Sequence, residues 1–335
     1  MIAGSSAGPE VSVVIPTYRR RASVERALKG LCLQTFPSER FETVVSIDGS
    51  EDGTRESVAA LRAPFSLRSL WQPNGGRAAA CNAGIRAARG DLVILLDDDM
   101  EPAPHFVAGH VEAHFPDRAP AGLRGVIGAV PVVVTPDSSP VVRYIAEGFA
   151  KHLEKLAQPG REIGIRDFYS GNFSIAREAL LRVGLFDESF REYGNEDGEL
   201  AIRLRAAGVA LTYSSEALAW QHYQKDFPGL ARDKMASGRT SVVSALRHPE
   251  SVPAMRIGTY RRGQPRWRLL RSLLISASRP LPFLPAWVLA WIRRGERRGS
   301  PRLKDFYFLA LDYFYWLGVR SALREHPEAR GRLLH

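Results

Sequence analysis

The sequence predicts an α/β fold built on a mostly parallel sheet flanked by helices. Short apolar runs alternate with helical patterns over the first hundred residues, and the runs are rich in the β-branched residues that strands prefer. Buried strands separated by helices are typical of parallel sheets, because a crossover must return the chain to the same edge. The chain has 335 residues and 45% apolar composition, which is enough for one large core or two modest ones.

The first hundred residues show this pattern most clearly. Strands are expected at Val11–Ile15, Val44–Ile47, Leu67–Trp71 and Leu92–Leu96. Helices are expected between them, the first capped by Ser23 and the others at Thr54–Leu61 and Arg77–Ala88. Because crossovers between parallel strands are right-handed, these elements predict a Rossmann-like half, in which ligands bind outside the carboxyl ends of the strands.

After Met100 the pattern is less regular. A long strand is expected at Val126–Thr135 and a shorter one at Val209–Tyr213. Helices are expected at Val141–Leu156, Arg177–Val183, Glu196–Ala207 and Leu230–Leu246. The segment Pro249–Pro265 is rich in Pro, Gly and Arg and therefore marks a boundary. We expect a disordered N-terminus (1–10), an α/β domain (11–248) and a basic, aromatic-rich helical extension (249–335).

Composition excludes two organising principles. Cys32 and Cys81 lie far apart and show no metal-ligand spacing, which excludes a zinc ribbon or a disulfide scaffold and favours a reducing compartment. The first ten residues show no secretory signal, and no run of about 18 apolar residues predicts a membrane span. We therefore expect a cytoplasmic protein.

The positive charge is confined to the last third of the chain. Residues 229–335 contain 21 Lys and Arg against 7 Asp and Glu, whereas residues 1–228 contain 25 against 29. This basic tail favours an anionic lipid surface or another polyanion as a partner, and the lipid would give a peripheral position on the inner face of the membrane. Alternatively, it is a solvated surface with no partner. Two segments carry aromatic and aliphatic residues beside arginines, Leu281–Ile292 and Phe306–Trp316. We expect them either to rest on a bilayer or to pack as helices against the core. No nucleic-acid partner is expected, because no binding motif is recognised.

Polar residues follow all four strands of the first half. These segments are Pro16-Thr17-Tyr18-Arg19, Asp48-Gly49-Ser50, Asn74-Gly75-Gly76-Arg77 and Asp97-Asp98-Asp99. The carboxyl ends of adjacent parallel strands meet at one edge of the sheet, so we expect these segments to lie together. Three adjacent carboxylates repel one another unless a cation lies among them, and oxygen ligands without thiolates suit Mg²⁺ or Mn²⁺. The alternative is an exposed acidic turn.

Common phosphate-binding motifs are absent from the sequence. No G-x-G-x-x-G follows the first strand, and no G-x-x-x-x-G-K-[ST] occurs, which removes the usual evidence for dinucleotide binding and P-loop chemistry. Gly75-Gly76 before a helix can still approach a phosphate or a sugar closely, or it forms a simple tight turn.

Three other residues are interpreted as structural. His110 and His114 are four residues apart but do not form H-E-x-x-H, so we expect them on a solvated helix face. Cys81 is expected to be a small buried apolar residue.

Five segments, in colinear order over roughly residues 11–225, resemble family 2 glycosyltransferases of the GT-A fold. They are Val11–Arg20, Ser46–Thr54, Asn74–Ile85, Ala88–Pro102 and Gly171–Gly208. The resemblance implies an inverting enzyme that transfers a sugar from a UDP-, dTDP- or GDP-sugar to a hydroxyl, with Mg²⁺ or Mn²⁺. The acceptor would be a glycan, a lipid-linked molecule or a small molecule. It also implies that residues 11–102 form a nucleotide-binding half and residues 103–248 an acceptor half.

The resemblance assigns roles in the nucleotide-binding half. Nucleotide-sugar contacts are implied for Pro16, Thr17, Tyr18, Asp48, Gly76, Arg77, Asp97 and Asp98. Asp48 matches the acid that reads the base, although Ile47 stands where many relatives have a second acid. Asp97 and Asp99 match the D-x-D metal signature. Arg77 is expected to supply a charge that relatives carry at the position of Cys81.

Roles in the acceptor half follow from the same resemblance. Gly171, Asn172 and Glu196 match acceptor-binding positions, and His222 matches a late metal-binding histidine. Asp197 is expected to act as the general base, because a hydroxyl that attacks near neutral pH benefits from a positioned base. Alternatively, Glu196 and Asp197 simply favour the start of a helix.

Two other functions fit the same fold. A sugar nucleotidyltransferase normally has a glycine-rich basic loop after the first strand, which Pro16–Arg21 lacks. A non-catalytic carbohydrate-binding or scaffold protein would not need the Asp97–Asp99 cluster or the Glu196-Asp197 pair.

Overall fold

The computed structural model describes residues 8–115, 123–260, 262 and 264–329, and these divide into two compact units. The first unit contains the chain up to Val133, Ala146–Arg191 and Glu196–Tyr223. The second contains Val134–Ile145, Glu192–Asn195 and the chain from Gln224 onward. The second unit thus begins upstream of the expected boundary segment Pro249–Pro265. Most of the expected disordered N-terminus (1–10) lies outside the described residues.

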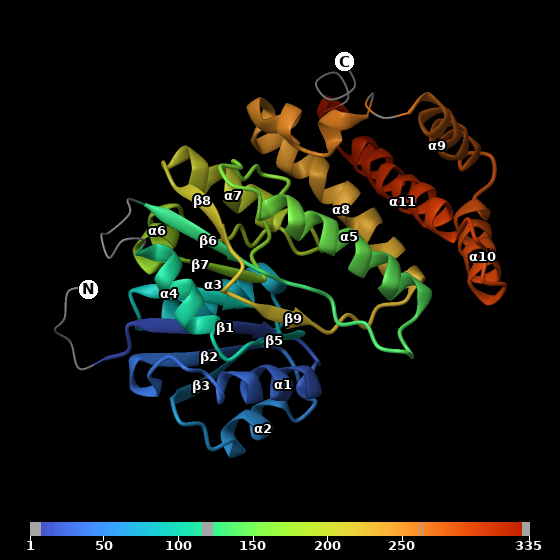
Figure 1. Cartoon of the computed structure of the whole chain (residues 1–335). Coiled ribbons are helices and arrows are strands. Elements are labelled where there is room, and N and C mark those ends of the chain that lie inside the picture. The colour runs from blue at the N-terminus through green and yellow to red at the C-terminus, as the bar shows by residue number, and fades with distance from the viewer. Residues whose placement is uncertain (1–7, 116–122, 261, 263, 330–335) are drawn as a thin grey trace. The chain divides into compact units, whose positions relative to one another are not determined.

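Within the described residues, seven strands form the sheet of the first unit in the order β3-β2-β1-β4-β7-β6-β8 (Figure 1). They are β1 (Val11–Thr17), β2 (Phe41–Asp48), β3 (Ser66–Gln72), β4 (Leu92–Leu96), β6 (Arg124–Gly128), β7 (Asn172–Ala176) and β8 (Ala210–Ser214). β7 runs antiparallel to β4 and β6, and the other neighbours are parallel. The predicted mostly parallel α/β fold is therefore confirmed.

Helices cover both faces of this sheet (Figure 1). They are α1 (Arg21–Leu31), α2 (Thr54–Ala60), α3 (Arg77–Ala87), α4 (Phe106–His114), α5 (Pro140–Leu156), α6 (Arg177–Arg182) and α7 (Glu196–Ala206). Side chains alternate along β1, so that Val13 and Ile15 pack in the core with α1 and α4. Val14 packs in the opposite core with α3, α6 and α7. Cys81 is fully buried there, as predicted.

The prediction of one long strand at Val126–Thr135 is wrong. β6 ends at Gly128, and the chain then leaves the main sheet to run beside β9 (Ala219–Gln221), with a single bridge from Val132 to Gln221. Pro131 interrupts the ladder because it has no N–H to donate, but its carbonyl oxygen accepts from the backbone N–H of Gln221 at 2.9 Å. β9 also pairs antiparallel with the short strand β5 (Met100–Pro102).

The prediction of a solvated face for His110 and His114 is also wrong, because both rings are buried between α4 and β7. Asn172 donates to the carbonyl oxygens of Ala129 and Ala217, so its Oδ1 must accept from His110 Nε2, 2.8 Å away. Nδ1 of the neutral ring then accepts from Ser174 Oγ at 2.8 Å, and His114 Nε2 donates to the same hydroxyl at 2.9 Å. A buried polar network that is fully satisfied fixes β7 against α4.

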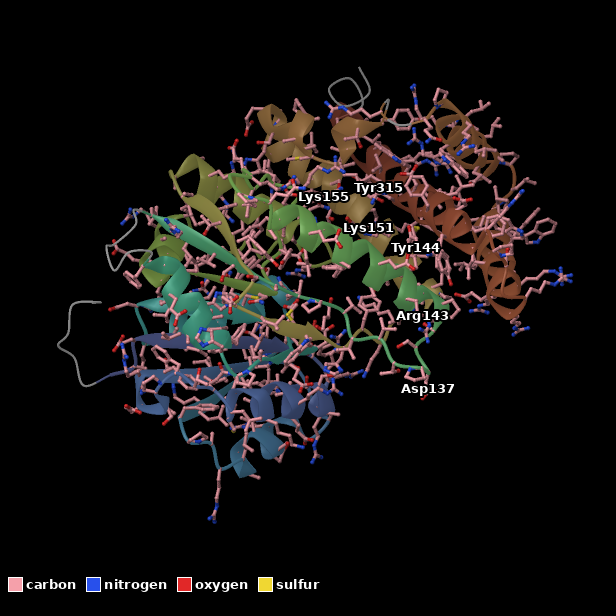
Figure 2. All side chains as sticks on the ribbon, in the orientation of Figure 1. Asp137, Arg143, Tyr144, Lys151, Lys155 and Tyr315 are labelled. Atoms are coloured by element: carbon pink, nitrogen blue, oxygen red, sulfur yellow. The ribbon has the colours of Figure 1, made fainter. Side chains whose placement is uncertain are left out.

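The second unit is mainly helical. Its helices are α8 (Phe227–Arg247), α9 (Pro265–Ala277), α10 (Leu284–Arg297) and α11 (Leu303–Glu325). α8 packs along α11, where Tyr315 donates to Ser241 Oγ at 2.9 Å. The segment Val134–Ile145 also belongs to this unit. In it, Arg143 donates hydrogen bonds to the carbonyl oxygens of Thr135 and Pro136. The centre of the neighbouring Tyr144 ring lies 5.2 Å from that of Tyr307 (Figure 2 labels Arg143, Tyr144 and Tyr315).

No helix in the described part of the chain has the length and apolar character needed to cross a membrane.

Close packing of α3 on β1 makes Gly84 sensitive to substitution. A Cβ at this position would lie 2.3 Å from Val14 Cγ1, so we expect Gly84→Ala to lower the free energy of unfolding by about 1–3 kcal/mol in urea denaturation. Adding Val14→Ala should recover part of this loss, because it removes the clashing methyl group. The matched control is Gly148→Ala on α5, where no atom lies within 4 Å and a gain of up to about 1 kcal/mol is expected. Equal stability of the two alanine variants would refute this packing.

Acid should destabilise the first unit through His110 and His114. Burial lowers the pKa of His110 to about 3 and that of His114 to about 4, whereas the unfolded chain protonates both with a pKa near 6.5. The contribution of these two histidines to the free energy of unfolding is therefore fully present above about pH 6.5. It is lost as the pH falls toward their pKa values in the folded protein, because the unfolded chain binds more protons in this range. The slope is up to roughly 1.4 kcal/mol per pH unit for each histidine.

Chemical denaturation near pH 7 and about pH 5 measures this effect. His114→Gln keeps a donor toward Ser174 but does not titrate. This variant should lose about 2 kcal/mol less stability than the wild type between the two pH values. The same loss in both proteins would mean that His114 does not contribute.

Candidate active site

The carboxyl ends of β1, β2 and β4 meet at one edge of the sheet, as expected. β1 lies between β2 and β4, so the order of the strands reverses between β1 and β4. Open α/β sheets bind ligands at such a switch point. Thr17 ends β1 and Asp97 directly follows β4, so the two strands that flank the switch point supply the first residues of the site.

Asp98 is the buried centre of the acidic triplet. Its carboxylate accepts from Thr17 Oγ1 at 2.8 Å and from Arg20 Nη1 at 2.9 Å. Burial raises the pKa of Asp98 to about 6, although the Arg20 charge and the Thr17 hydrogen bond oppose this rise. Arg20 Nη1 also lies 3.4 Å from Asp99 Oδ2. Thr17 and Arg20 therefore hold the triplet against the end of β1.

Arg77 joins acids from two distant parts of the chain. Its Nη2 lies 2.8 Å from Asp97 Oδ1, and its Nη1 lies 3.1 Å from Asp197 Oδ1 and 3.9 Å from Glu196 Oε1. Burial opposes the charge on Arg77, but Asp97 and Asp197 outweigh burial and raise the pKa of Arg77 well above its ordinary value. A permanent positive charge therefore lies between the D-x-D segment and the start of α7.

Ser170 and Gly171 complete this link. Ser170 Oγ donates to Asp197 Oδ1 at 2.5 Å, and its backbone N–H donates to Oδ2 at 3.3 Å. A Cβ on Gly171 would lie 2.3 Å from Asp97 Oδ2, so glycine leaves room for this carboxylate. The Gly171 carbonyl oxygen also accepts from the backbone N–H of Asp97 at 2.8 Å. The segment before β7 thus positions Asp97 and Asp197, the two acids nearest to Arg77.

Asp48 holds the glycine turn that leads into α3. Its buried carboxylate accepts from the backbone N–H groups of Gly75 and Gly76 at 2.8 and 2.9 Å and from the Gln72 amide at 2.9 Å. Gly76 has a φ of +90°, a conformation that favours glycine. Asp48 therefore fixes the turn that places Arg77 at the site.

The other nucleotide contacts implied by the resemblance differ in exposure. Pro16 is buried within β1, opposite Ser46 of β2. Tyr18 is 43% exposed, and the Arg19 guanidinium lies 5.2 Å from the centre of its ring. Arg19 has a φ of +53°, and its N–H donates to Ser50 Oγ at 2.7 Å. The end of β1 therefore presents an accessible aromatic ring beside the acidic triplet.

Two residues expected at the site have side chains that are engaged by other partners. The Asn172 side chain is fully buried and bonded to His110, Ala129 and Ala217, so it does not face an acceptor as the resemblance implied. His222 Nε2 lies 2.7 Å from Glu101 Oε2, and its backbone N–H donates to the Asp99 carbonyl oxygen at 2.9 Å. Among the residues that the structure describes, no three His, Cys, Asp or Glu side chains are already arranged around a metal position.

Three further residues contact the site without having been predicted from the sequence: Arg20, Ser170 and Glu101. Arg20 offered a signal, because it stands directly beyond the first strand, at the edge where ligands bind. Ser170 and Glu101 offered none, since their contacts are with residues 27 and 121 positions away in the chain.

Comparisons with known proteins show which family the chain resembles. The family model "Glycosyl transferase family 2" matches residues 12–188. Validoxylamine A glucosyltransferase from Streptomyces hygroscopicus subsp. jinggangensis is 32% identical over 233 residues, which cover 62% of this chain and 54% of that protein. Chondroitin synthase from Escherichia coli is 28% identical over 272 residues, which cover 72% of this chain and 38% of that protein. The chain thus spans about half or less of the length of these two relatives.

Solved structures share the fold. The mannosyltransferase PcManGT from Pyrobaculum calidifontis, in complex with GDP-Man and Mn²⁺, has a TM-score of 0.61 and 20% identity over 95% of this chain and 88% of that chain. S. aureus TarS 1–349 in complex with UDP-GlcNAc has a TM-score of 0.52 and 15% identity over 95% of this chain and 92% of that chain. These likenesses confirm the GT-A fold. Because the family model matches more than half of the residues, including the strands and loops that build this edge, the chain belongs to glycosyl transferase family 2.

Proposed function

We propose that this protein transfers a sugar from a UDP-, dTDP- or GDP-sugar to an acceptor hydroxyl, with a divalent metal and with inversion at the anomeric carbon. The observation that supports this function is the convergence of Asp97, Asp98 and Asp99 with Arg77 and Asp197 at the switch point of the sheet. Residues 11–102 would bind the nucleotide, and residues 103–248 would bind a glycan, lipid-linked or small-molecule acceptor.

The donor would lie along the end of β1 and the turn before α3. Tyr18 offers an accessible ring face for the base, and Thr17 lies at the acidic triplet. Asp48 keeps Gly75 and Gly76 in a turn whose backbone can approach the donor closely, and Arg77 follows directly with a positive charge for it. Relatives of this fold are described with GDP-Man or UDP-GlcNAc bound, which supports a nucleotide-sugar donor without identifying the base.

Mg²⁺ or Mn²⁺ would be held by Asp97 and Asp99, with His222 as a further ligand. Carboxylate oxygens are the ligands that these hard cations prefer, and the crowding of three acids at the end of β4 fits a cation. When bound, the cation would neutralise charge that develops on the departing nucleoside diphosphate. His222 would have to give up its contact with Glu101 to take part.

Asp197 would accept the proton of the acceptor hydroxyl as that oxygen attacks the anomeric carbon in a single displacement. Ser170 and Arg77 orient its carboxylate, since both donate hydrogen bonds to it. Glu196 would orient the acceptor from the first turn of α7. Gly171 contributes the space that lets Asp97 stand beside this pair.

Nucleotide binding should depend on the metal and on Asp99. A ligand that binds only the folded state at a hundredfold excess over its Kd adds about 2.7 kcal/mol to the free energy of unfolding. We expect a rise in the midpoint of thermal unfolding with one of UDP, GDP, dTDP or CDP in the presence of Mn²⁺, and no such rise in Asp99→Ala. A shift that survives in Asp99→Ala would remove this residue from the metal site. No shift with any nucleotide would favour a non-catalytic scaffold.

Asp197→Asn should abolish transfer while leaving nucleotide binding intact. The amide keeps the shape of the carboxylate but cannot accept the proton, so kcat should fall by about 10²- to 10⁴-fold. Release of nucleoside diphosphate from the matching sugar nucleotide measures this, and the Mn²⁺-dependent thermal shift shows that the donor still binds. Glu178→Gln, an exposed acid on α6, is the matched control and should retain full activity. Wild-type activity in Asp197→Asn would exclude Asp197 as the base.

A further inference from the structure

A large share of the exposed large apolar side chains lies on α9, on α10, in the segment between them and at the start of α11. Of the fifteen large apolar side chains that are exposed among the described residues, eight fall between positions 269 and 308. They are Leu269, Leu270, Leu273, Leu281, Phe283, Trp287, Trp291 and Phe308. Single exposed apolar residues are normal on a protein surface, but a cluster of this size marks an interaction site. We call these residues the outer patch.

α10 shows why internal packing does not account for the outer patch. Its inner face is formed by Val288, Ile292 and Gly295, which are buried, and Gly295 faces Leu303 and Phe306 of the neighbouring helix α11. An amphipathic helix packs one apolar face against its neighbours, and these residues form that face of α10. The solvent face nevertheless carries Trp287, 68% exposed, and Trp291, 44% exposed. The Trp291 ring packs against that of Phe306 on α11, with ring centroids 4.0 Å apart, and the Trp287 ring lies 5.6 Å from that of Phe283. Both tryptophans remain exposed despite these contacts, so apolar residues cover two sides of the first turns of the helix.

Positive charge lies next to Trp291 on the same helix. Arg293, Arg294, Arg297 and Arg298 follow Trp291 directly and are exposed. In the part of the chain that the structure describes, none of the four is paired with a carboxylate. A groove of about 720 Å³ runs along the helix, lined by Ala286, Leu289, Ala290 and Trp291 at its apolar end and by these four arginines at the other. The face is thus apolar at one end and cationic at the other.

We propose that the outer patch and these arginines bind the surface of an anionic lipid bilayer. Tryptophan and leucine side chains enter the boundary between headgroups and acyl chains, and arginines contact the phosphates above them, as in helices that lie in the membrane interface. Two of the exposed leucines, Leu269 and Leu273, are four residues apart on α9, so they form one apolar face of that helix. α9 and α10 both contact α11, which places them in one unit (Figure 1).

Charge and shape favour a bilayer over other partners. A second copy docked on the same face would bring eight unpaired arginines together, because a two-fold interface places the same patch on both sides. A nucleic acid would use the arginines and tryptophans, but aliphatic Leu269, Leu270 and Leu273 have no counterpart in a phosphate backbone. A bilayer with anionic headgroups complements both the charged and the aliphatic part.

Vesicle co-sedimentation of the full chain tests the proposal. Vesicles of phosphatidylcholine with phosphatidylglycerol should bind the protein at about 0.1 M salt, and phosphatidylcholine alone should bind it far less. Arg293→Gln with Arg294→Gln should weaken binding to the anionic vesicles roughly 30-fold, since each basic residue near such a surface contributes to the attraction. Arg55→Gln with Arg62→Gln, which removes the same charge from exposed positions of the first unit, should bind like the wild type.

A second variant separates insertion from simple charge attraction. Trp287→Ala should weaken binding and make the remainder more sensitive to salt, because the apolar contribution is lost while the arginines stay. Both variants should keep the wild-type midpoint of thermal unfolding and its metal-dependent nucleotide shift, so failure here is distinct from failure of the proposed transferase site. Three results would overturn the proposal: equal binding by both arginine pairs, no binding to anionic vesicles, or a dimer in solution that Trp287→Ala converts to a monomer.

Discussion

The ion pairs of Arg77 are the contacts on which the whole site depends. One guanidinium group contacts Asp97 after β4 and Asp197 at the start of α7, residues that are 100 positions apart in the chain. Asp48 and Gly76 set the turn that brings Arg77 there, and Ser170 sets the partner carboxylate. The strand ends and the following helix are thereby brought to one point. A change at any of these positions therefore affects both the donor side and the acceptor side of the proposed reaction.

Close approach of backbone and side chain is the second constraint. Gly171 lets the Asp97 carboxylate stand against β7, and Gly84 lets α3 lie against Val14 of β1. The buried network of His110, Ser174 and Asn172 then holds β7 where these contacts need it. Several carboxylates lie close together at this edge of the sheet. The strands that carry them are held in place by packing and by satisfied hydrogen bonds, so the fold tolerates the repulsion between these acids.

The sequence predicted the elements whose signals are local. Runs such as Val11–Ile15 and Leu92–Leu96 became strands, and their polar ends met at one edge. Features that depend on distant partners were missed. His110 and His114 look like a polar helix face until β7 supplies Ser174 and Asn172, and the strand expected at Val126–Thr135 ends early because Pro131 and β9 redirect the chain. Asn172 was assigned by resemblance to the acceptor, but neighbours far along the chain use its whole amide.

The balance of charge at the edge explains why the proposed reaction includes a metal. Five carboxylates, those of Asp97, Asp98, Asp99, Glu196 and Asp197, share the guanidinium groups of Arg20 and Arg77. A nucleotide diphospho-sugar brings further negative charge to a partly buried place, where repulsion is poorly screened. Arg77 cannot offset this alone, because it already serves Asp97 and Asp197. A divalent cation on Asp97 and Asp99 would reverse the sign of the field near the diphosphate and leave Arg77 to orient Asp197.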